Sequence, residues 1–485
     1  MRLSDVLPAD IAPPAGANAI EVVGITAASA AVSPGLIFAG LPGTKVDGAA
    51  YIPDAATRGA RVVIAGRGKA ANVPDGVTLI EVDNPRRVLA LIAAKFAGAQ
   101  PGVAVAVTGT SGKTSVADFT RQIFSALGRQ TASLGTIGVV KPSGAVYGSL
   151  TTPDPVTLHA TLAGLAHEGV THLAFEASSH GLDQHRLDGV TLTAAAFTNL
   201  GRDHMDYHPT VEAYLAAKLR LFTELLQPGR TAVINTDGPY ANEVIAAAKA
   251  RGLNVMTVGR DGTTLRRMSL ANQGFAQMMS VEASGVHYDV RLPLVGAYQA
   301  ENALTAAGLA IAAGEETGRV LAALAQLRGV PGRLEIIGEA KGGLAIVDYA
   351  HKPEALTAAL AACRPFVSGK LICVFGCGGD RDKGKRPVMG AIAAESADVV
   401  IVTDDNPRSE TPSVIRAEIL AAAPGALEIG DRADAIRKAV TMMSKGDVLL
   451  VAGKGHETGQ ITGATVVPFS DHEELTKALM GALPT

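Results

Sequence analysis

The chain has 485 residues, of which 47% are hydrophobic and 18% are charged, and its formal net charge is −3. This length allows about three domains at ~150 residues each, and the composition is too apolar for a disordered protein. The near-neutral charge, without a basic block, argues against nucleic acid as a partner.

Cysteine usage and the first residues bear on the cellular compartment. Cys363, Cys373 and Cys377 form no C-x-x-C pair, which favours a reducing cytoplasm over a disulfide framework. We expect Cys373 and Cys377 to be small apolar residues near a strand end rather than zinc ligands. The N-terminus lacks a basic segment followed by an apolar run, and no apolar run is long enough to span a bilayer. We therefore expect a cytoplasmic protein, a monomer, with no membrane insertion.

The first region, residues 1–98, carries short apolar runs separated by Pro and Gly turns. This pattern predicts a small α/β domain. The runs lie at 19–25, 36–41, 61–65 and 77–82. Gln100-Pro101-Gly102 then breaks the chain and marks a domain boundary.

The second region, residues 99–330, alternates apolar runs with helical patterns. Such alternation predicts a parallel sheet covered by helices. We expect strands at 103–107, 171–176, 193–198 and 231–235, and helices at 113–127, 156–168 and 211–226. Residues 253–295 show Val/Tyr alternation typical of an antiparallel excursion, and an alanine-rich helix is expected at 299–313.

A glycine loop follows the first of these strands and precedes a helical pattern. Its sequence is Gly109-Thr110-Ser111-Gly112-Lys113-Thr114-Ser115. Backbone N–H groups of such a loop and the helix N-terminus attract phosphate, the lysine reaches the β- and γ-phosphates, and the next hydroxyl faces Mg²⁺. Val107 stands where the usual pattern has its first glycine, so the loop is shorter than usual. The alternative is a simple strand-to-helix turn, but the Lys-Thr pair at the helix start favours nucleotide binding.

Two further strand ends carry a carboxylate and an imidazole. Glu176 ends the expected strand 171–176, and His204 lies in the polar run 199–208 after the strand 193–198. Ligands bind at the carboxyl ends of strands in open parallel sheets, and Mg²⁺ takes few protein ligands when phosphate oxygens complete its shell. Glu176 and His204 are therefore predicted metal or substrate contacts. Helix capping or hydrogen bonding in the core is the alternative.

The third region, residues 331–485, begins after the turn-rich hinge at 329–333. Strands expected at 344–348, 370–375, 397–402 and 447–451 alternate with helices, which predicts a doubly wound sheet. Charged residues follow three of these strands, among them Arg381, Arg408 and Glu457. Two arginines and a glutamate at converging strand ends suit a zwitterion, because arginine pairs with carboxylate and glutamate with ammonium. A solvated charged rim is the alternative.

These clusters, in this order, resemble the Mur ligase family of peptidoglycan synthesis over almost the whole chain. The resemblance rests on the glycine loop, Thr151-Thr152-Pro153-Asp154, the Glu176 segment, residues 199–208 and Tyr349-Ala-His-Lys-Pro. It implies an α/β protein of three domains. A UDP-sugar domain is expected at 1–98, a central ATP-binding P-loop domain with helices on both faces of a parallel sheet at 99–330, and a C-terminal Rossmann-like amino-acid domain at 331–485.

The resemblance also implies an activity. Family members are ATP-dependent amide ligases that work through an acyl phosphate. The tetrapeptide Asp405-Asn406-Pro407-Arg408 resembles the branch that adds meso-2,6-diaminopimelate to UDP-N-acetylmuramoyl-L-alanyl-D-glutamate, since members that add L-lysine lack this arginine. The implied small-molecule partners are these two substrates and ATP, and the implied metal is Mg²⁺.

Site residues are carried over from the family position by position. Magnesium contacts are expected at Thr114, Glu176, His204 and Lys218, the last as a carbamate (N6-carboxylysine), with Lys113 as the further catalytic residue. ATP contacts beyond the loop are expected at Asn302, Arg333, Asp348 and His351. The UDP-muramoyl dipeptide would contact Ser29, Thr44, Lys45, Val46, Thr151, Thr152, Ser178, Gln184 and Arg186. Diaminopimelate would contact Arg381, Asp405, Asn406, Pro407, Arg408, Gly453 and Glu457.

Two rival functions remain. One is another ligase of the same superfamily, such as the D-Ala-D-Ala-adding enzyme or folylpolyglutamate synthase, against which the tetrapeptide 405–408 argues. The other is a nucleotide-gated regulatory protein that kept the fold but lost turnover. The presence of Lys113, Glu176, His204 and Lys218 argues against such a protein.

Overall fold

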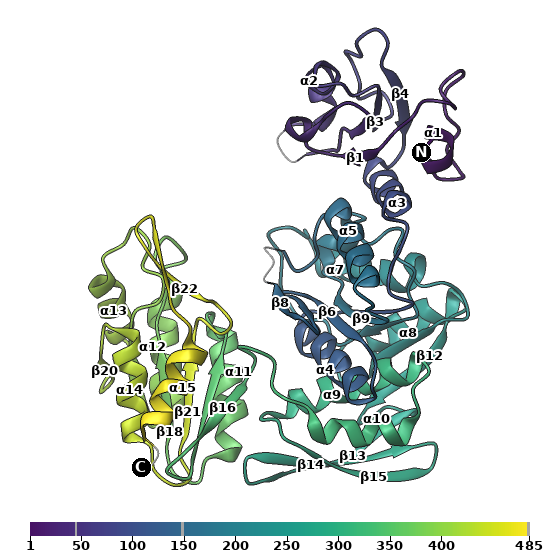
Figure 1. Cartoon of the computed structure of the whole chain (residues 1–485). Helices are drawn as coiled ribbons and strands as arrows, with labels where there is room; N and C mark the ends of the chain where they lie inside the picture. The colour runs from purple at the N-terminus through teal and green to yellow at the C-terminus, as the bar shows by residue number, and fades with distance from the viewer. Residues whose placement is uncertain (44–45, 147–149, 483–485) are drawn as a thin grey trace. The chain divides into compact units, whose positions relative to one another are not determined.

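A computed structural model describes residues 1–43, 46–146 and 150–482 of the chain, which is drawn in Figure 1. The chain divides into two compact units, Met1–Val258 with Gly308–Glu315, and Gly259–Ala307 with Glu316–Thr485. No described helix is long and apolar enough to cross a membrane. The three domain boundaries expected from the sequence stay a prediction, because this division does not test them.

The N-terminal part of the first unit is a small parallel sheet. Its strands lie in chain order, β1-β2-β3-β4, and helix α3 buries Val88, Leu89 and Ile92 against them. Only Gly24 and Ile25 of the expected run 19–25 lie in strand β1. Glu21 instead forms an isolated bridge with Arg2, and the Val22 carbonyl accepts a hydrogen bond from the N-terminal amine. The bounds are α1 Leu3–Val6, β1 Gly24–Thr26, β2 Leu36–Ala39, α2 Ile52–Thr57, β3 Val62–Gly66, β4 Thr78–Val82 and α3 Pro85–Ala97.

The central part of the first unit is a larger sheet in the order β12-β11-β10-β5-β9-β6-β7-β8. Strands β12 to β6 pair in parallel and β7 and β8 are antiparallel. Strand β5 lies in the middle of the sheet, where it pairs with β10 on one side and with β9 on the other. The loop after β5 therefore lies at a topological switch point, where ligands of such sheets bind.

The expected strands and helices of this region are present, with shifted ends. The helix expected over 211–226 is α-helical only to Arg220 and continues as a π-helical turn over Leu221–Leu225. Strands β6 to β8 were not expected, because they are short and rich in Gly, a composition typical of loops. The bounds are β5 Val103–Thr108, α4 Lys113–Ala126, β6 Thr131–Gly135, β7 Gly138–Lys141, β8 Gly144–Val146, α5 Pro155–His167, β9 His172–Glu176, α6 Ser179–Asp183, β10 Ala194–Phe197, α7 Val211–Arg220, β11 Thr231–Asn235, α8 Ala241–Ala250 and β12 Asn254–Gly259.

The second unit begins with the antiparallel strands that the sequence predicts after residue 253. Strands β13 to β15 pair antiparallel, whereas β12, which was included in that expectation, pairs parallel to β11. The alanine-rich helix is α9, which crosses the division between the units. The bounds are β13 Leu265–Gln273, β14 Ala276–Ala283, β15 Val286–Leu292, α9 Ala297–Ala312 and α10 Thr317–Ala323.

The rest of the second unit is a sheet in the order β16-β17-β21-β18-β19-β20, in which only β16 is antiparallel. Side chains of β17 alternate between two cores: Leu344 and Ile346 pack with α11, α12 and α13, and Ala345 and Val347 pack with α14 and α15. Figure 1 shows these helices around the strands. The α/β class with doubly wound parallel strands is thus confirmed. The bounds are β16 Glu335–Ala340, β17 Gly343–Asp348, α11 Pro353–Cys363, β18 Leu371–Phe375, α12 Lys385–Ser396, β19 Val399–Val402, α13 Pro412–Leu420, β20 Leu427–Glu428, α14 Arg432–Met442, β21 Val448–Ala452, β22 Gly459–Thr462, β23 Thr465–Pro468 and α15 Asp471–Ala482.

The three cysteines are free and buried. Burial raises the pKa of the Cys373 thiol to about 12 and that of Cys377 to about 11. Cys373 lies on β18 and Cys377 follows its end, which is the position expected for small buried residues near a strand end.

Candidate active site

The glycine loop connects β5 to α4 as the sequence predicts. Gly109 has φ 151° and Gly112 has φ 87°, values that favour glycine. A Cβ on Gly109 would lie 1.9 Å from Thr198 Oγ1, so this position also excludes a side chain. The loop and the N-terminus of α4 form the arrangement that cradles phosphate groups.

The polar run after β10 holds this loop in place. The N–H of Thr110 donates to the Asn199 carbonyl at 2.9 Å, and the N–H of Ser111 donates to Asn199 Oδ1 at 2.9 Å. The N–H of Gly201 donates to Thr110 Oγ1 at 2.8 Å. Segments that are about 90 residues apart in the sequence are therefore joined at the carboxyl edge of the sheet.

Two lysines meet at this loop. Lys113 Nζ donates to the carbonyl oxygens of Gly109 and Thr110, each at 2.9 Å. Lys218, on α7, is 1% exposed, and its Nζ donates to the same Gly109 oxygen at 2.7 Å. Burial, and secondarily the charge of Lys113, lower the pKa of Lys218 to about 6. Lys218 therefore presents a neutral amine at neutral pH.

The other expected magnesium contacts lie on neighbouring strand ends. Glu176 is 1% exposed and accepts from the Thr136 N–H at 2.7 Å and the Thr136 hydroxyl at 3.3 Å. His204 has φ 54° and a half-exposed ring whose centroid lies 4.9 Å from that of His180. Thr114 is the second residue of α4.

These residues fit a magnesium ion by their chemistry. No Lys, Arg or His of the described chain forms a salt bridge with Glu176, so its buried carboxylate lacks a cationic partner. A buried carboxylate of this kind suits a cation. Among the described residues, no group of three or more His, Cys, Asp or Glu side chains is placed to hold a metal ion. The ligand roles stay predictions.

The expected muramoyl contacts of the central sheet form one hydrogen-bond network. Thr152 Oγ1 donates to the Glu176 carbonyl at 3.1 Å and lies 3.0 Å from Ser178 Oγ. Arg186 donates to the Thr152 carbonyl at 2.6 Å and to Gln184 Oε1 at 2.8 Å. Thr151 joins through its hydroxyl, 3.0 Å from that of Thr136. The structure thus brings these residues together.

Gln184 and Arg186 line a cavity of about 500 Å³ between the small N-terminal sheet and the central sheet. The residues 26–28 form part of its wall, and Ser29 follows them in a 3₁₀ turn without lining it. Val46 is exposed, while Thr44 and Lys45 lie outside the described residues. Sequence reasoning missed further wall residues, namely Arg86, Leu89, Asp154 and Thr157.

A second cavity, of about 780 Å³, opens at the carboxyl edge of the C-terminal sheet. Loops after β17, β18, β19 and β21 form its walls. It gathers the expected amino-acid contacts except Pro407, namely Arg381, Asp405, Asn406, Arg408, Gly453 and Glu457. The convergence expected from the strand ends is therefore present. The binding roles themselves stay predictions.

Asn406 organises the polar wall of this cavity. Its Nδ2 donates to Glu457 Oε2 at 2.8 Å, and its Oδ1 accepts from Lys454 Nζ at 2.9 Å and from the Ile461 N–H at 3.0 Å. Arg408 donates to the Gly379 carbonyl at 2.9 Å. Lys454 is fully buried, and sequence reasoning missed it. The Gly-Lys-Gly-His-Glu run was the available signal.

The remaining expected ATP contacts form a cluster in the second unit. Asn302 donates to Gln299 Oε1 at 3.0 Å, and Gln299 donates to the Arg333 carbonyl at 2.7 Å. The Arg333 guanidinium lies 5.3 Å from the Tyr349 ring centroid. Burial raises the pKa of Asp348 to about 6, although the N–H groups of Leu334 and Ala350 donate to it. His351 lines the 780 Å³ cavity, and burial lowers its pKa.

Comparisons with known proteins cover nearly the whole chain. Residues 21–97 match the model of the Mur ligase family, catalytic domain; residues 107–310 match the Mur ligase middle domain; and residues 332–455 match the Mur ligase, glutamate ligase domain. Two similar curated proteins are named UDP-N-acetylmuramoyl-L-alanyl-D-glutamate–2,6-diaminopimelate ligase. The one from Bradyrhizobium diazoefficiens is 58% identical over 99% of both chains, and the one from Agrobacterium fabrum is 57% identical over 95% of this chain and 94% of its own.

Solved structures agree at the level of the fold. A structure with the same ligase name is 31% identical, covers 99% of both chains and has a TM-score of 0.76. A MurF ligase from Thermotoga maritima in complex with ADP is 20% identical, covers 96% of this chain and 98% of its own, and has a TM-score of 0.59. At that identity the likeness concerns the fold alone.

Proposed function

The chain belongs to the Mur ligase family, and we propose that it adds meso-2,6-diaminopimelate to the D-glutamate of UDP-N-acetylmuramoyl-L-alanyl-D-glutamate with consumption of ATP. The observation that carries this proposal is the 780 Å³ cavity, in which Arg381, Arg408 and Glu457 face one space. Among its charged residues, the two arginines can pair with the two carboxylates of meso-diaminopimelate, and Glu457 can pair with the amino group that does not react.

The reaction begins with activation of a carboxylate. The D-glutamate γ-carboxylate attacks the γ-phosphorus of ATP, which yields an acyl phosphate and ADP. The glycine loop binds the phosphates through its backbone N–H groups, and Lys113 exchanges the Gly109 and Thr110 carbonyls for phosphate oxygens. Mg²⁺, when bound, neutralises the phosphate charge.

Thr114, Glu176, His204 and a carbamylated Lys218 would hold that ion. Carbamylation requires a neutral amine, and the lowered pKa of Lys218, about 6, supplies one. The modification would add CO₂ to this neutral amine with release of a proton, and it would place an anion close to Lys113. An anion there attracts the Lys113 ammonium.

The second step forms the amide bond. The diaminopimelate amine attacks the acyl carbon, a tetrahedral intermediate forms, and phosphate leaves with the C–O electron pair. Arg381 and Arg408 would pair with the amino acid's carboxylates, and Glu457, held by Asn406 at 2.8 Å, would accept its ammonium. Gln184 and Arg186 would hold the muramoyl dipeptide from the 500 Å³ cavity.

We place this activity in the cytoplasm, with a monomer as the acting species. A phosphate-release assay with the UDP-muramoyl dipeptide, ATP and Mg²⁺ tests the proposal. Release should depend on meso-diaminopimelate and should stay near background with L-lysine or L-ornithine. Release without any amino acid acceptor would support simple ATP hydrolysis. No release under any condition would support a regulatory protein without turnover.

A further inference from the structure

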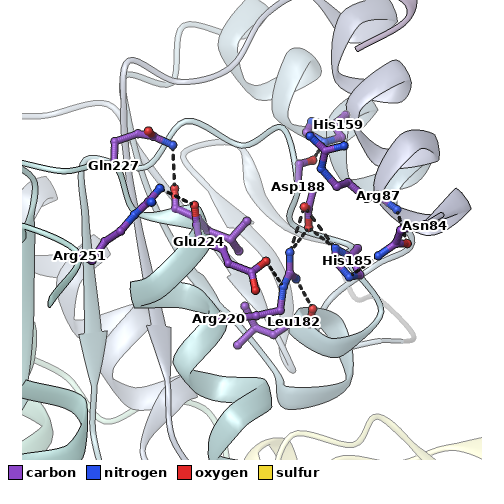
Figure 2. A network of polar contacts seen from close by, with 11 residues as sticks. Asn84, Arg87, His159, Leu182, His185, Asp188, Arg220, Glu224, Gln227 and Arg251 are labelled. Carbon is purple, nitrogen blue, oxygen red and sulfur yellow. Dashed lines mark hydrogen bonds and ion pairs between the residues drawn. The ribbon is translucent and has the colours of Figure 1, made fainter. Parts of the chain in front are cut away.

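A series of polar contacts joins the N-terminus of α3 to the C-terminus of α7 (Figure 2), next to residues that line the 500 Å³ cavity. Asn84 Nδ2 lies 2.7 Å from His185 Nε2, and His185 Nδ1 lies 3.3 Å from Asp188 Oδ1. Arg220 donates to both carboxylate oxygens of Asp188 at 3.0 Å and also donates to the Leu182 carbonyl. None of these four side chains belongs to the proposed substrate, ATP or metal contacts.

The chain of contacts connects both walls of that cavity. His185 stands between Gln184 and Arg186, whose side chains line it, and Asn84 precedes the helix that contributes Arg86 and Leu89. Arg220 is the last residue of α7, two positions after Lys218. A shift of His185 would therefore move the turn that carries Gln184 and Arg186 relative to α3.

Neighbouring groups determine how each side chain in this series of contacts is oriented. Asn84 Oδ1 caps α3 by accepting from the Arg87 N–H at 3.1 Å, so the Asn84 amide nitrogen must face the ring and donate. His185 Nε2 consequently accepts, and Nδ1 carries the proton toward Asp188. Arg220 neutralises the Asp188 carboxylate and fixes its position. His185 has φ 56°, so the contacts also hold a backbone conformation that few residue types adopt.

We infer that Asn84 and His185 are positioning residues that set the affinity for the nucleotide-sugar substrate. They act through Gln184 and Arg186 and do not touch the reacting atoms. This inference rests on the proposed function, because it assigns the 500 Å³ cavity to the UDP-muramoyl dipeptide. A typical net hydrogen bond corresponds to about 2- to 10-fold in a binding constant, and this is the change expected on loss of the Asn84–His185 contact.

Two substitutions break the contact while sparing other roles. Asn84→Ser keeps a good helix cap, because serine accepts from the first-turn N–H groups as well as asparagine does, but its hydroxyl is too short to reach the ring. His185→Asn keeps a residue type that tolerates positive φ but cannot span from Asn84 to Asp188. Asn84→Ala serves as the matched control, since it removes the cap as well as the contact.

The test is steady-state kinetics of the full chain with each substrate varied in turn. Both variants should raise the KM for the UDP-muramoyl dipeptide about 2- to 10-fold, with kcat and the KM values for ATP and diaminopimelate unchanged. The double variant should have no higher dipeptide KM than the more affected single variant, because both substitutions remove the Asn84–His185 contact. Asn84→Ala should show the same KM and a lower melting temperature.

Three results would overturn the inference if the wild type is active. They are an unchanged dipeptide KM in both single variants, equal KM increases for all three substrates, and full additivity of the two effects in the double variant. Absence of turnover in the wild type itself would instead overturn the proposed function, and the inference with it.

Discussion

Lys113 and Lys218 donate to the same carbonyl oxygen, that of Gly109, at 2.9 Å and 2.7 Å. Two ammonium groups this close repel one another, and Lys218 is the buried partner at 1% exposure. Its pKa falls to about 6 as a result of burial and of the neighbouring charge. The pair thus combines a phosphate-binding cation with an amine that is ready to react.

The lowered pKa of Lys218 predicts how stability depends on pH. The pKa is about 6 in the folded protein against an ordinary 10.5, so the unfolded chain binds one more proton between these values. Stability therefore rises with pH across this window and falls as pH drops toward 6. In CO₂-free buffer, the wild-type free energy of unfolding, relative to Lys218→Met, should rise by about 1.4 kcal/mol per pH unit between pH 7 and 9. Urea denaturation measures this difference, and parallel profiles would contradict the low pKa.

The carbamate proposal predicts chemical rescue. Lys218→Ala should be nearly inactive and should regain part of its activity when short-chain carboxylates are added, because they restore an anion beside the metal. Lys113→Ala is the matched control, since a carboxylate cannot replace a cation there. Kinetics with and without acetate or propionate test this. Full activity of Lys218→Ala without any addition would rule the carbamate out.

Lys113→Ala should abolish ATP-dependent ligation and leave the fold intact. The Lys113 amine donates to two carbonyl oxygens of the glycine loop, so we expect its loss to remove phosphate binding rather than core packing. The exposed Lys249 on α8 provides a control, and Lys249→Ala should behave as wild type. Circular dichroism and the phosphate-release assay together check the prediction. Near-normal turnover of Lys113→Ala would disprove the role of the loop.

Arg408→Ala should weaken diaminopimelate binding selectively. A charge-assisted hydrogen bond contributes about 1.5–3 kcal/mol, which corresponds to roughly 10- to 150-fold in the KM for this substrate. The KM for ATP should change little, and Arg381→Ala should behave similarly. Arg437, whose side chain is 54% exposed on α14, is the control position. A KM for diaminopimelate that is unchanged in Arg408→Ala would remove Arg408 from the site.

A buried ion pair supports the amino-acid cavity from behind. Arg432 and Asp471 are both 0% exposed in their side chains, with Nε and Nη2 each 2.7 Å from a carboxylate oxygen, and Arg432 also donates to the Ala452 carbonyl at 2.9 Å. Asp471→Asn leaves a buried cation without its partner and should cost about 3–5 kcal/mol of unfolding free energy. Asp434→Asn, in the exposed pair with Arg437, should cost under about 1 kcal/mol. Denaturant titration of both variants measures the two losses of unfolding free energy. Equal losses would contradict the claim that burial makes the Arg432–Asp471 pair more important for stability.

Local signals account for what could be predicted from the sequence. Gly109 and Lys113 belong to a run whose sequence predicts a strand, a turn and the start of a helix. The charged residues around Arg408 directly follow a predicted strand. Arg86 gives no such signal, because it reaches the 500 Å³ cavity only through the packing of α3 near α5. Asp154 stands in the Thr-Thr-Pro-Asp motif, but its sequence does not show which cavity it lines. The Gly-Lys-Gly-His-Glu run places Lys454 directly after a predicted strand, but it does not show that this lysine will be fully buried against Asn406.

The most direct test is one reaction with equal concentrations of meso-diaminopimelate and L-lysine and with ¹⁸O at both oxygens of the D-glutamate γ-carboxylate of the UDP-muramoyl dipeptide. Mass spectrometry should find the diaminopimelate tripeptide as the dominant product and one ¹⁸O atom in each phosphate released, because the acyl phosphate gives its bridging oxygen to phosphate. A lysine product in equal amount would contradict the substrate assignment. Phosphate without ¹⁸O would contradict the acyl-phosphate mechanism.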